Sequence, residues 1–112
     1  MQRADLATAV NGGYIEEYEL DLRRKLLVLR VDVLDGQTLT SYELRFELLS
    51  HFEYDTESRS DSEARLQLTE LWLDASPEDS PTEEWSITIS IFDLSHIRLR
   101  CSVISVDGQT LK

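Results

Sequence analysis

The sequence is poor in the residues that would commit it to a disulfide scaffold or a membrane span. It has one cysteine, Cys101, so no internal disulfide can form, and this suits a reducing compartment. No apolar run approaches the roughly 20 residues that a membrane-spanning helix needs. The first residues, Met1 to Leu6, lack the apolar stretch of a secretory signal. We therefore expect a cytoplasmic protein without membrane contact.

Basic residues are also scarce. The chain carries 22 acidic and 11 basic residues, a formal net charge of −11. The imbalance is greatest between Glu53 and Glu84, where eleven acidic residues stand against two arginines. A field of this sign repels nucleic acid and anionic lipid, because both bind through cationic side chains. We therefore expect no nucleic-acid partner, and we expect a charged partner to be a basic protein. The alternative is that the negative charge serves only to keep the protein soluble.

The 112 residues, of which 41% are hydrophobic, suit one domain spanning 1–112. Arg3 to Val10 contains good helix formers and predicts a short N-terminal helix. Asn11, Gly12 and Gly13 follow it and tolerate the positive φ that ends a helix.

After residue 13 the hydrophobic pattern changes to alternation, which is typical of strands with one buried face. The alternating rows are Tyr42 to Tyr54, Trp85 to Ile91, Ile97 to Val103, Leu27 to Val33 and, more weakly, Tyr14 to Leu20. Ser50 interrupts the first row and indicates a bend. Short links such as Asp35-Gly36 favour antiparallel neighbours, since parallel strands need long crossovers. We predict a mainly β fold, an antiparallel meander of six or seven strands that forms a curled sheet or partial barrel.

Residues 61–73 fit two structures. Ser60 and Glu63 have the spacing of a helix capping box, and Ala64, Leu68, Leu71 and Trp72 would share a helical face. Leu66, Leu68 and Trp72 also fit one face of a strand, which we favour. The alternative is an α+β fold with a helix at about 61–73. Asp74 to Glu83 contains two prolines and dense charge, and predicts a mobile loop.

No strong catalytic or cofactor motif is present, so we predict a protein that is not an enzyme and has no cofactor. The four glycines stand at 12, 13, 36 and 108 and form no phosphate loop. One cysteine and two histidines exclude the usual structural zinc site. His51, Glu53 and Asp55 would share one face of a regular strand and could ligate a metal or hold a general base. The solvated face of a strand is the simpler interpretation, and we predict no metal.

Two sets of residues are candidates for binding. An acidic set would contact a basic partner protein: Glu53, Asp55, Glu57, Asp61, Glu63, Glu78 and Asp79. Trp72 and Trp85, with nearby tyrosines, would instead line a pocket for a small molecule or carbohydrate, although core packing is the commoner use of tryptophan in a small domain. A non-catalytic protein-binding domain is our first hypothesis and the ligand pocket is the alternative. Unpaired sheet edges also make a homodimer a possible state.

The order of the segments resembles known small proteins. Gly13-Tyr14-Ile15-Glu16-Glu17-Tyr18-Glu19-Leu20-Asp21 precedes an apolar strand, Tyr42-Glu43-Leu44-Arg45-Phe46 follows, and Ile97-Arg98-Leu99-Arg100-Cys101-Ser102-Val103 comes near the end. This order is similar to that of several small bacterial families of unknown function, some grouped with immunity proteins of polymorphic toxin systems. The resemblance rests on β-patterning and transfers no functional residue. It implies a cytoplasmic protein that neutralises a toxin by binding, and the acidic segment would then suit a basic toxin.

Overall fold

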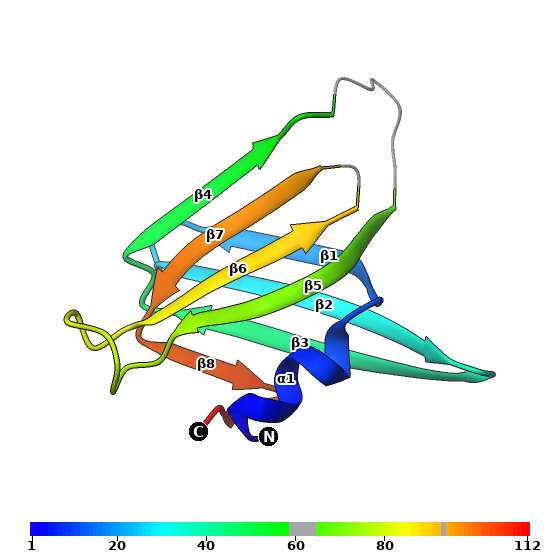
Figure 1. The fold of residues 1–112 in the computed structure, drawn as a ribbon, viewed down its shortest axis with the longest axis horizontal. Coiled ribbons are helices and arrows are strands. Elements are labelled where there is room, and N and C mark those ends of the chain that lie inside the picture. The colour runs from blue at the N-terminus through cyan, green and yellow to red at the C-terminus, as the bar shows by residue number, and fades with distance from the viewer. Residues whose placement is uncertain (59–64, 93) are drawn as a thin grey trace.

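A computed structural model of the protein describes residues 1–58, 65–92 and 94–112, and this part of the chain is mainly β, with a short N-terminal helix (Figure 1). The elements in chain order are α1 (Arg3–Val10), β1 (Tyr14–Asp21), β2 (Leu26–Asp35), β3 (Thr38–Glu47), β4 (His51–Thr56), β5 (Leu66–Ala75), β6 (Trp85–Ile91), β7 (Ser95–Cys101), β8 (Val103–Val106) and β9 (Gln109–Thr110).

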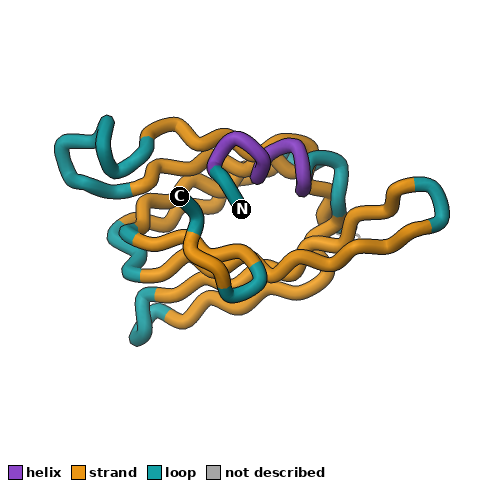
Figure 2. Tube along the Cα trace, turned by 90° about the horizontal axis from the view of Figure 1, so that it is seen from below, coloured by secondary structure: helices purple, strands orange, loops and turns teal. Residues whose placement is uncertain are grey.

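The described strands form one antiparallel sheet of nine strands in the order β4-β7-β6-β5-β1-β2-β3-β8-β9, which does not close into a barrel. The sheet curls into two layers, β4-β7-β6-β5 and β1-β2-β3-β8-β9, with the core between them (Figure 2). Only Tyr14 and Ile15 of β1 pair with β5, opposite Gln67 and Leu66, so the junction of the layers is narrow within the described residues. The predicted fold class, a curled antiparallel sheet with an N-terminal helix, is confirmed.

The strand count exceeds the predicted six or seven because continuous patterns are divided between layers. The row Ile97 to Val103 breaks at Ser102, whose N–H donates to the carbonyl of Glu47. β7 therefore pairs with β4 and β6, and β8 pairs with β3 in the other layer. The row Tyr42 to Tyr54 divides in the same way. The residue with positive φ there is Leu48, at 57°, which lies two residues before Ser50, where the bend is predicted. The strand order consequently differs from that of a simple meander.

The segment 66–73 is a strand, so the alternative of a helix is wrong there; residues 61–64 of that prediction lie outside the described residues. The helix-like spacing of Leu68 and Leu71, both buried, has a local cause. The register against β6 shifts between Leu68 and Glu70, and this bulge returns Leu71 to the inner face. A bulge thus converts a three-residue spacing into one strand face.

Helix α1 packs on the core through Leu6 and Val10, which are fully buried. It ends as predicted at Asn11, after which Gly12 has φ of 85°. The side-chain oxygen of Asn11 accepts the N–H of Leu71 at 3.0 Å, and Gly12 donates to the carbonyl of Leu68 at 2.8 Å. These bonds fix the end of the helix to β5.

Glycine is needed at position 13 because the backbone there packs closely against β2, and not because the residue must adopt a positive φ. A Cβ at this position would lie 2.8 Å from Cγ1 of Val31 and 2.9 Å from Cγ2 of Val33. Real Cβ atoms essentially never come so close to a neighbour, so a side chain here would displace β2. The first residues of β1 therefore lie directly against β2, where the two layers meet.

Candidate functional site

An apolar cleft of about 380 Å3 lies between the two layers of the sheet. One wall comes from β1 and β2, and the other from β4, β7 and the adjoining ends of β5 and β6. Figure 1 shows how these strands are arranged. Every lining residue is aliphatic or aromatic: Ile15, Tyr18, Leu20, Leu27, Leu29, Phe52, Tyr54, Leu66, Ile91 and Ile97. This volume is at the low end of the range of roughly 300–1,000 Å3 that is usual for ligand pockets.

The cleft stays open because β1 leaves β5 after two residue pairs. A register shift between Ile15 and Glu17 marks the point at which β1 turns away and continues beside β2 alone, among the described strands. The remainder of β1 and the outer edge of β4 then lie on either side of the cleft. The layers are joined at one end of β1 and splayed at the other.

The cleft exposes residues that stand on the core side of their strands. Tyr18 and Leu20 pair with Leu29 and Leu27, which are buried, so all four side chains share the inner face. Tyr18 is nevertheless 69% exposed and Leu20 37% exposed. On the opposite wall Tyr54 pairs with the buried Ile97 and is 54% exposed. This part of the inner face is apolar and open to solvent.

The outer face of β4 carries the charged residues that the sequence singled out. Glu53 and Asp55 both lie near Arg98 of β7, whose Nη1 is 3.8 Å from Oε1 of Glu53 and donates to Oδ2 of Asp55 at 2.8 Å. His51 Nε2 lies 3.5 Å from Oε2 of Glu53, and His96 Nδ1 lies 3.5 Å from Oδ1 of Asp55. This arrangement is an exposed ladder of polar side chains, in which Arg98 makes the cross-strand ion pairs and each histidine lies beside one carboxylate.

The ladder does not have the form of a metal centre. His51, Glu53 and Asp55 share one face as expected, but Arg98 forms ion pairs with both carboxylates and so occupies the place of a cation. In the described ranges, no group of three or more His, Cys, Asp or Glu side chains could hold a metal ion. His96 lies beside Asp55 because β7 pairs with β4.

The five acidic candidates that the structure describes do not gather on one surface. Glu53 and Asp55 lie on β4, and Glu57 follows its end. Glu78 and Asp79 lie in the loop after β5, at the far end of that ten-residue strand (Figure 1). Asp61 and Glu63 lie outside the described residues. The described members of this acidic set are thus divided between two ends of the fold, although the segment is continuous in sequence.

Glu78 and Asp79 have local partners that tie down their loop. Arg3 donates to Glu78 through Nη1 at 3.1 Å and through Nη2 at 3.3 Å, and these bonds lower the pKa of the Glu78 carboxyl. Ser76 donates to Asp79 at 3.0 Å. Arg3 also lies 5.5 Å above the ring of Trp85, which joins the N-terminus, the loop and β6.

The two tryptophans lie on opposite faces of the sheet. Trp85 is buried in the core, whereas Trp72 is 43% exposed. Trp72 pairs with Thr88, which stands between the buried Ile87 and Ile89 and so faces outward. They do not line a common pocket, and neither lines the apolar cleft.

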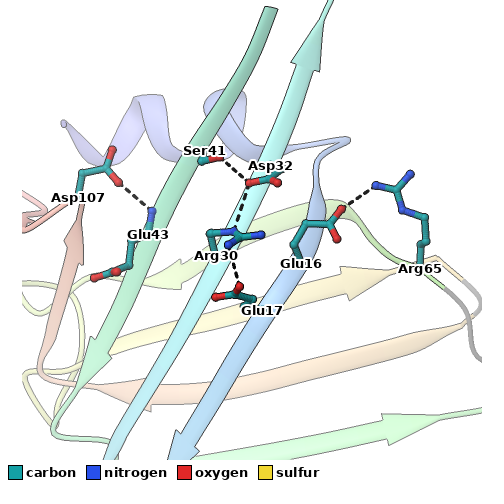
Figure 3. Close-up of polar contacts among 8 residues, drawn as sticks. All are labelled: Glu16, Glu17, Arg30, Asp32, Ser41, Glu43, Arg65 and Asp107. Atoms are coloured by element: carbon teal, nitrogen blue, oxygen red, sulfur yellow. Dashed lines mark hydrogen bonds and ion pairs between the residues drawn. The ribbon is translucent and has the colours of Figure 1, made fainter.

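The outer face of β1, β2 and β3 is held by another polar network (Figure 3). Arg30 donates to Glu17 at 2.8 Å and lies 3.6 Å from Asp32, which accepts a hydrogen bond from Ser41 at 2.7 Å. At the start of β1, Arg65 donates to Glu16 at 2.7 Å. Its guanidinium carbon also lies 3.8 Å from the centre of the Tyr14 ring. These bonds fix strand register on the side away from the cleft.

Cys101 lies in the core as expected from its row of apolar neighbours. Burial, with a contribution from the charge of Glu84, raises the pKa of its thiol to about 12. A thiol in that state stays protonated at neutral pH and is a poor nucleophile.

The lining residues of the cleft are the site that the sequence did not reveal. Tyr18, Leu20, Phe52 and Tyr54 follow the same alternation as core residues, and nothing in that pattern marks them as uncovered. The available signal was the weak row Tyr14 to Leu20, which has fewer apolar residues than its neighbours.

None of the helices in the described residues is long and apolar enough to cross a membrane. Comparison of the sequence with protein-family models and with curated proteins finds no match. The function is therefore argued from the geometry of the site.

Proposed function

We propose that the protein is a non-catalytic binding domain that takes an apolar segment of a partner protein into the cleft between β1 and β4. The observation that carries the proposal is the exposure of Tyr18, Leu20 and Tyr54 on the inner face of the sheet. Aromatic residues with a polar tip are enriched at protein interfaces, where they bury a large area and keep a hydrogen bond. Filling the cleft would remove these side chains from water.

Charge favours a basic partner. The protein has a net charge of −11, and carboxylates line the outer faces of both strands that flank the cleft: Glu17 and Glu19 on β1, and Glu53 and Asp55 on β4. Complementary charge speeds association and excludes acidic competitors. A cytoplasmic immunity role against a basic toxin, as the resemblance implies, is one form of this proposal.

The second candidate is binding of a small apolar molecule in the same cleft. The volume of about 380 Å3 and the wholly apolar lining support it. The two candidates share a site and differ in the occupant, so an experiment that identifies the occupant separates them.

Site-specific photocrosslinking tests the proposal. Benzoylphenylalanine replaces Tyr18 in one variant and Leu34 in a control, since both residues are about equally exposed and Leu34 lies at the tip of the β2–β3 hairpin. We expect a discrete protein adduct from position 18 in cells that naturally produce the chain, and its loss when Leu20→Asp is added. Equal adducts from positions 18 and 34 would contradict the proposal.

Native mass spectrometry of the purified protein tests the second candidate. A small apolar molecule that copurifies with the wild type and is absent from Leu20→Asp would favour it over a protein partner. A wild-type protein that carries no small molecule and forms the protein adduct would favour the first candidate.

A further inference from the structure

On the β4 side, the cleft is bordered by a strand edge that no other described strand pairs with. β4 pairs with β7 along its full length, from His51 opposite Arg100 to Thr56 opposite Ser95. On its other side the ladders of the described residues give β4 no partner. Within the described residues, its backbone N–H and C=O groups on that side have no strand partner, so they could bond an added strand directly beside the apolar cleft.

The inner side chains of β4 belong to the cleft and the outer ones are charged. Phe52 and Tyr54 point inward and line the cleft, whereas Glu53 and Asp55 point outward. A strand laid along this edge would place alternate side chains over the cleft and the others beside the two carboxylates. One extended segment could thus fill the cleft and meet the charge.

The chain itself shows which sequence β4 accepts on its paired side. β7 alternates apolar residues facing inward, Ile97 and Leu99, with arginines facing outward, Arg98 and Arg100. Arg98 bonds Asp55 and lies near Glu53. Strand β2 shows the same arrangement against β1, where Arg30 bonds Glu17 between the inward Leu29 and Val31.

We propose that the partner segment adds to the free edge of β4 as a further strand in which apolar residues alternate with arginine or lysine. Its apolar side chains enter the cleft against Phe52, Tyr54 and Tyr18, and its cations face Glu53 and Asp55. The proposal rests on the proposed function, since it specifies how a protein segment would occupy the cleft. Backbone bonds would supply affinity and the alternating side chains would supply specificity.

A second copy of the chain fits this edge less well. Antiparallel pairing of two β4 strands would bring Glu53 and Asp55 of both copies together, and like charges opposite one another destabilise a sheet. Each copy also carries a net charge of −11. The charge therefore favours a foreign, basic strand.

A synthetic peptide tests the strand. Because β4 has six residues, a capped peptide of about seven alternating arginines and leucines covers it. The readout is hydrogen exchange of the 15N-labelled protein by NMR. With free peptide at about ten times its Kd, exchange of the β4 amides that point away from β7 should slow about tenfold.

Three peptides matched to the alternating peptide test whether its side-chain order and its backbone hydrogen bonds are needed for binding. A block peptide of the same composition, with all arginines before all leucines, should bind at least about tenfold more weakly, which corresponds to about 1.4 kcal/mol. Two further peptides carry N-methyl groups on the arginine amides or on the leucine amides. Since alternate amides of a strand point to the same side, one of these two should lose binding and the other should keep it.

Other outcomes overturn the inference. An added strand would be excluded if the block peptide bound as well as the alternating one or if both methylated peptides kept binding. It would also be excluded if the alternating peptide did not bind at all. A dimer that dissociates in Tyr54→Asp and takes no peptide would assign the edge to a second copy. A peptide that shifts the ring signals of Tyr18 and Tyr54 without protecting β4 amides overturns the added strand and leaves the proposed function standing. The proposed function fails separately, through the crosslinking experiment.

Two variants test whether the position of a carboxylate, and not only the total charge, affects peptide binding. Glu53→Gln should weaken the alternating peptide, because it removes a carboxylate beside the added cations. Glu70→Gln is the matched control. Glu70 is exposed on the outer face of β5, so this substitution removes the same charge at a place away from the β4 edge. A loss of affinity that is equal in both variants would reduce the effect to overall charge and count against the specific placement.

Discussion

Tyr18 and Leu29 are cross-strand partners on the inner face of the sheet, and Tyr18 is 69% exposed whereas Leu29 is 1% exposed. The pair shows how the cleft arises. β2 lies between β1 and β3 and is covered by the second layer, while this part of β1 lies at the splayed side. Two adjacent residues with the same orientation thus have different environments, one in the core and one in the candidate site.

The first prediction follows from that difference. Leu29→Ala should lower the free energy of unfolding by about 2–5 kcal/mol, since it removes a buried side chain and leaves a cavity. Tyr18→Ala should change it by less than about 1 kcal/mol, because the ring is mostly in water. Urea denaturation of both variants measures the contrast. Equal losses would mean that Tyr18 belongs to the core and that the cleft is closed in solution.

The second prediction concerns the close approach at Gly13. Gly13→Ala should destabilise the protein by about 1–3 kcal/mol, because the new Cβ would overlap Val31 and Val33. The double variant Gly13→Ala/Val33→Ala should recover part of the loss, since it removes one of the overlapping methyl groups. Thermal unfolding of the four members of this double-mutant cycle measures the coupling. A strictly additive cycle would refute the overlap.

The third prediction concerns the end of helix α1. Asn11→Ala should destabilise the protein by about 1–3 kcal/mol, because the partly buried N–H of Leu71 loses its acceptor. Asn11→Asp is the control, since a carboxylate keeps an acceptor at the same place. Hydrogen exchange at Leu71 should accelerate in the alanine variant and stay slow in the aspartate variant. Fast exchange in the wild type would contradict the bond.

The fourth prediction is a pH dependence at the loop that Arg3 holds. The bonds from Arg3 lower the pKa of Glu78 below its usual value near 4.5. A carboxyl whose folded pKa is depressed stabilises the fold above its unfolded pKa, and this contribution is lost as the pH falls towards the folded value. The NMR titration of Glu78 should therefore have its midpoint below 4.5, and Arg3→Gln should raise it.

Glu19→Gln is the matched control for that titration. It removes one negative charge from β1 without touching the Arg3–Glu78 bonds. The midpoint of Glu78 should then stay close to the wild-type value. A shift as large as that of Arg3→Gln would assign the depressed pKa to the overall charge of the protein.

The sequence by itself determined the elements of this protein. Alternation of apolar and polar residues specifies strands wherever one face is buried, as in Trp85 to Ile91, where every second residue is buried. Asp35-Gly36 and Asp107-Gly108 specify tight turns because both glycines adopt positive φ there, at 63° and 82°. These features are local, so short-range chemistry is sufficient to predict them.

Only the tertiary structure decided which strands meet. In the sequence, Leu48 continues an apolar row and Ser102 takes a regular polar position, yet each marks the place where the chain passes from one layer to the other. The spacing of Leu68 and Leu71 resembles a helix because a bulge displaces one residue. Pairing partners lie far apart along the chain, and periodicity contains no information about them.

The candidate site depends on the same long-range decisions. Tyr18 and Tyr54 have the pattern of core residues, and they are exposed because β1 leaves β5 after two pairs and β4 ends its layer without a further described neighbour. The acidic segment is continuous in sequence, whereas its described candidate residues are divided between β4 with its end and the loop after β5. A pattern fixes the side of the strand on which a residue stands, whereas burial depends on what packs against that side, and the packing is a property of the whole fold.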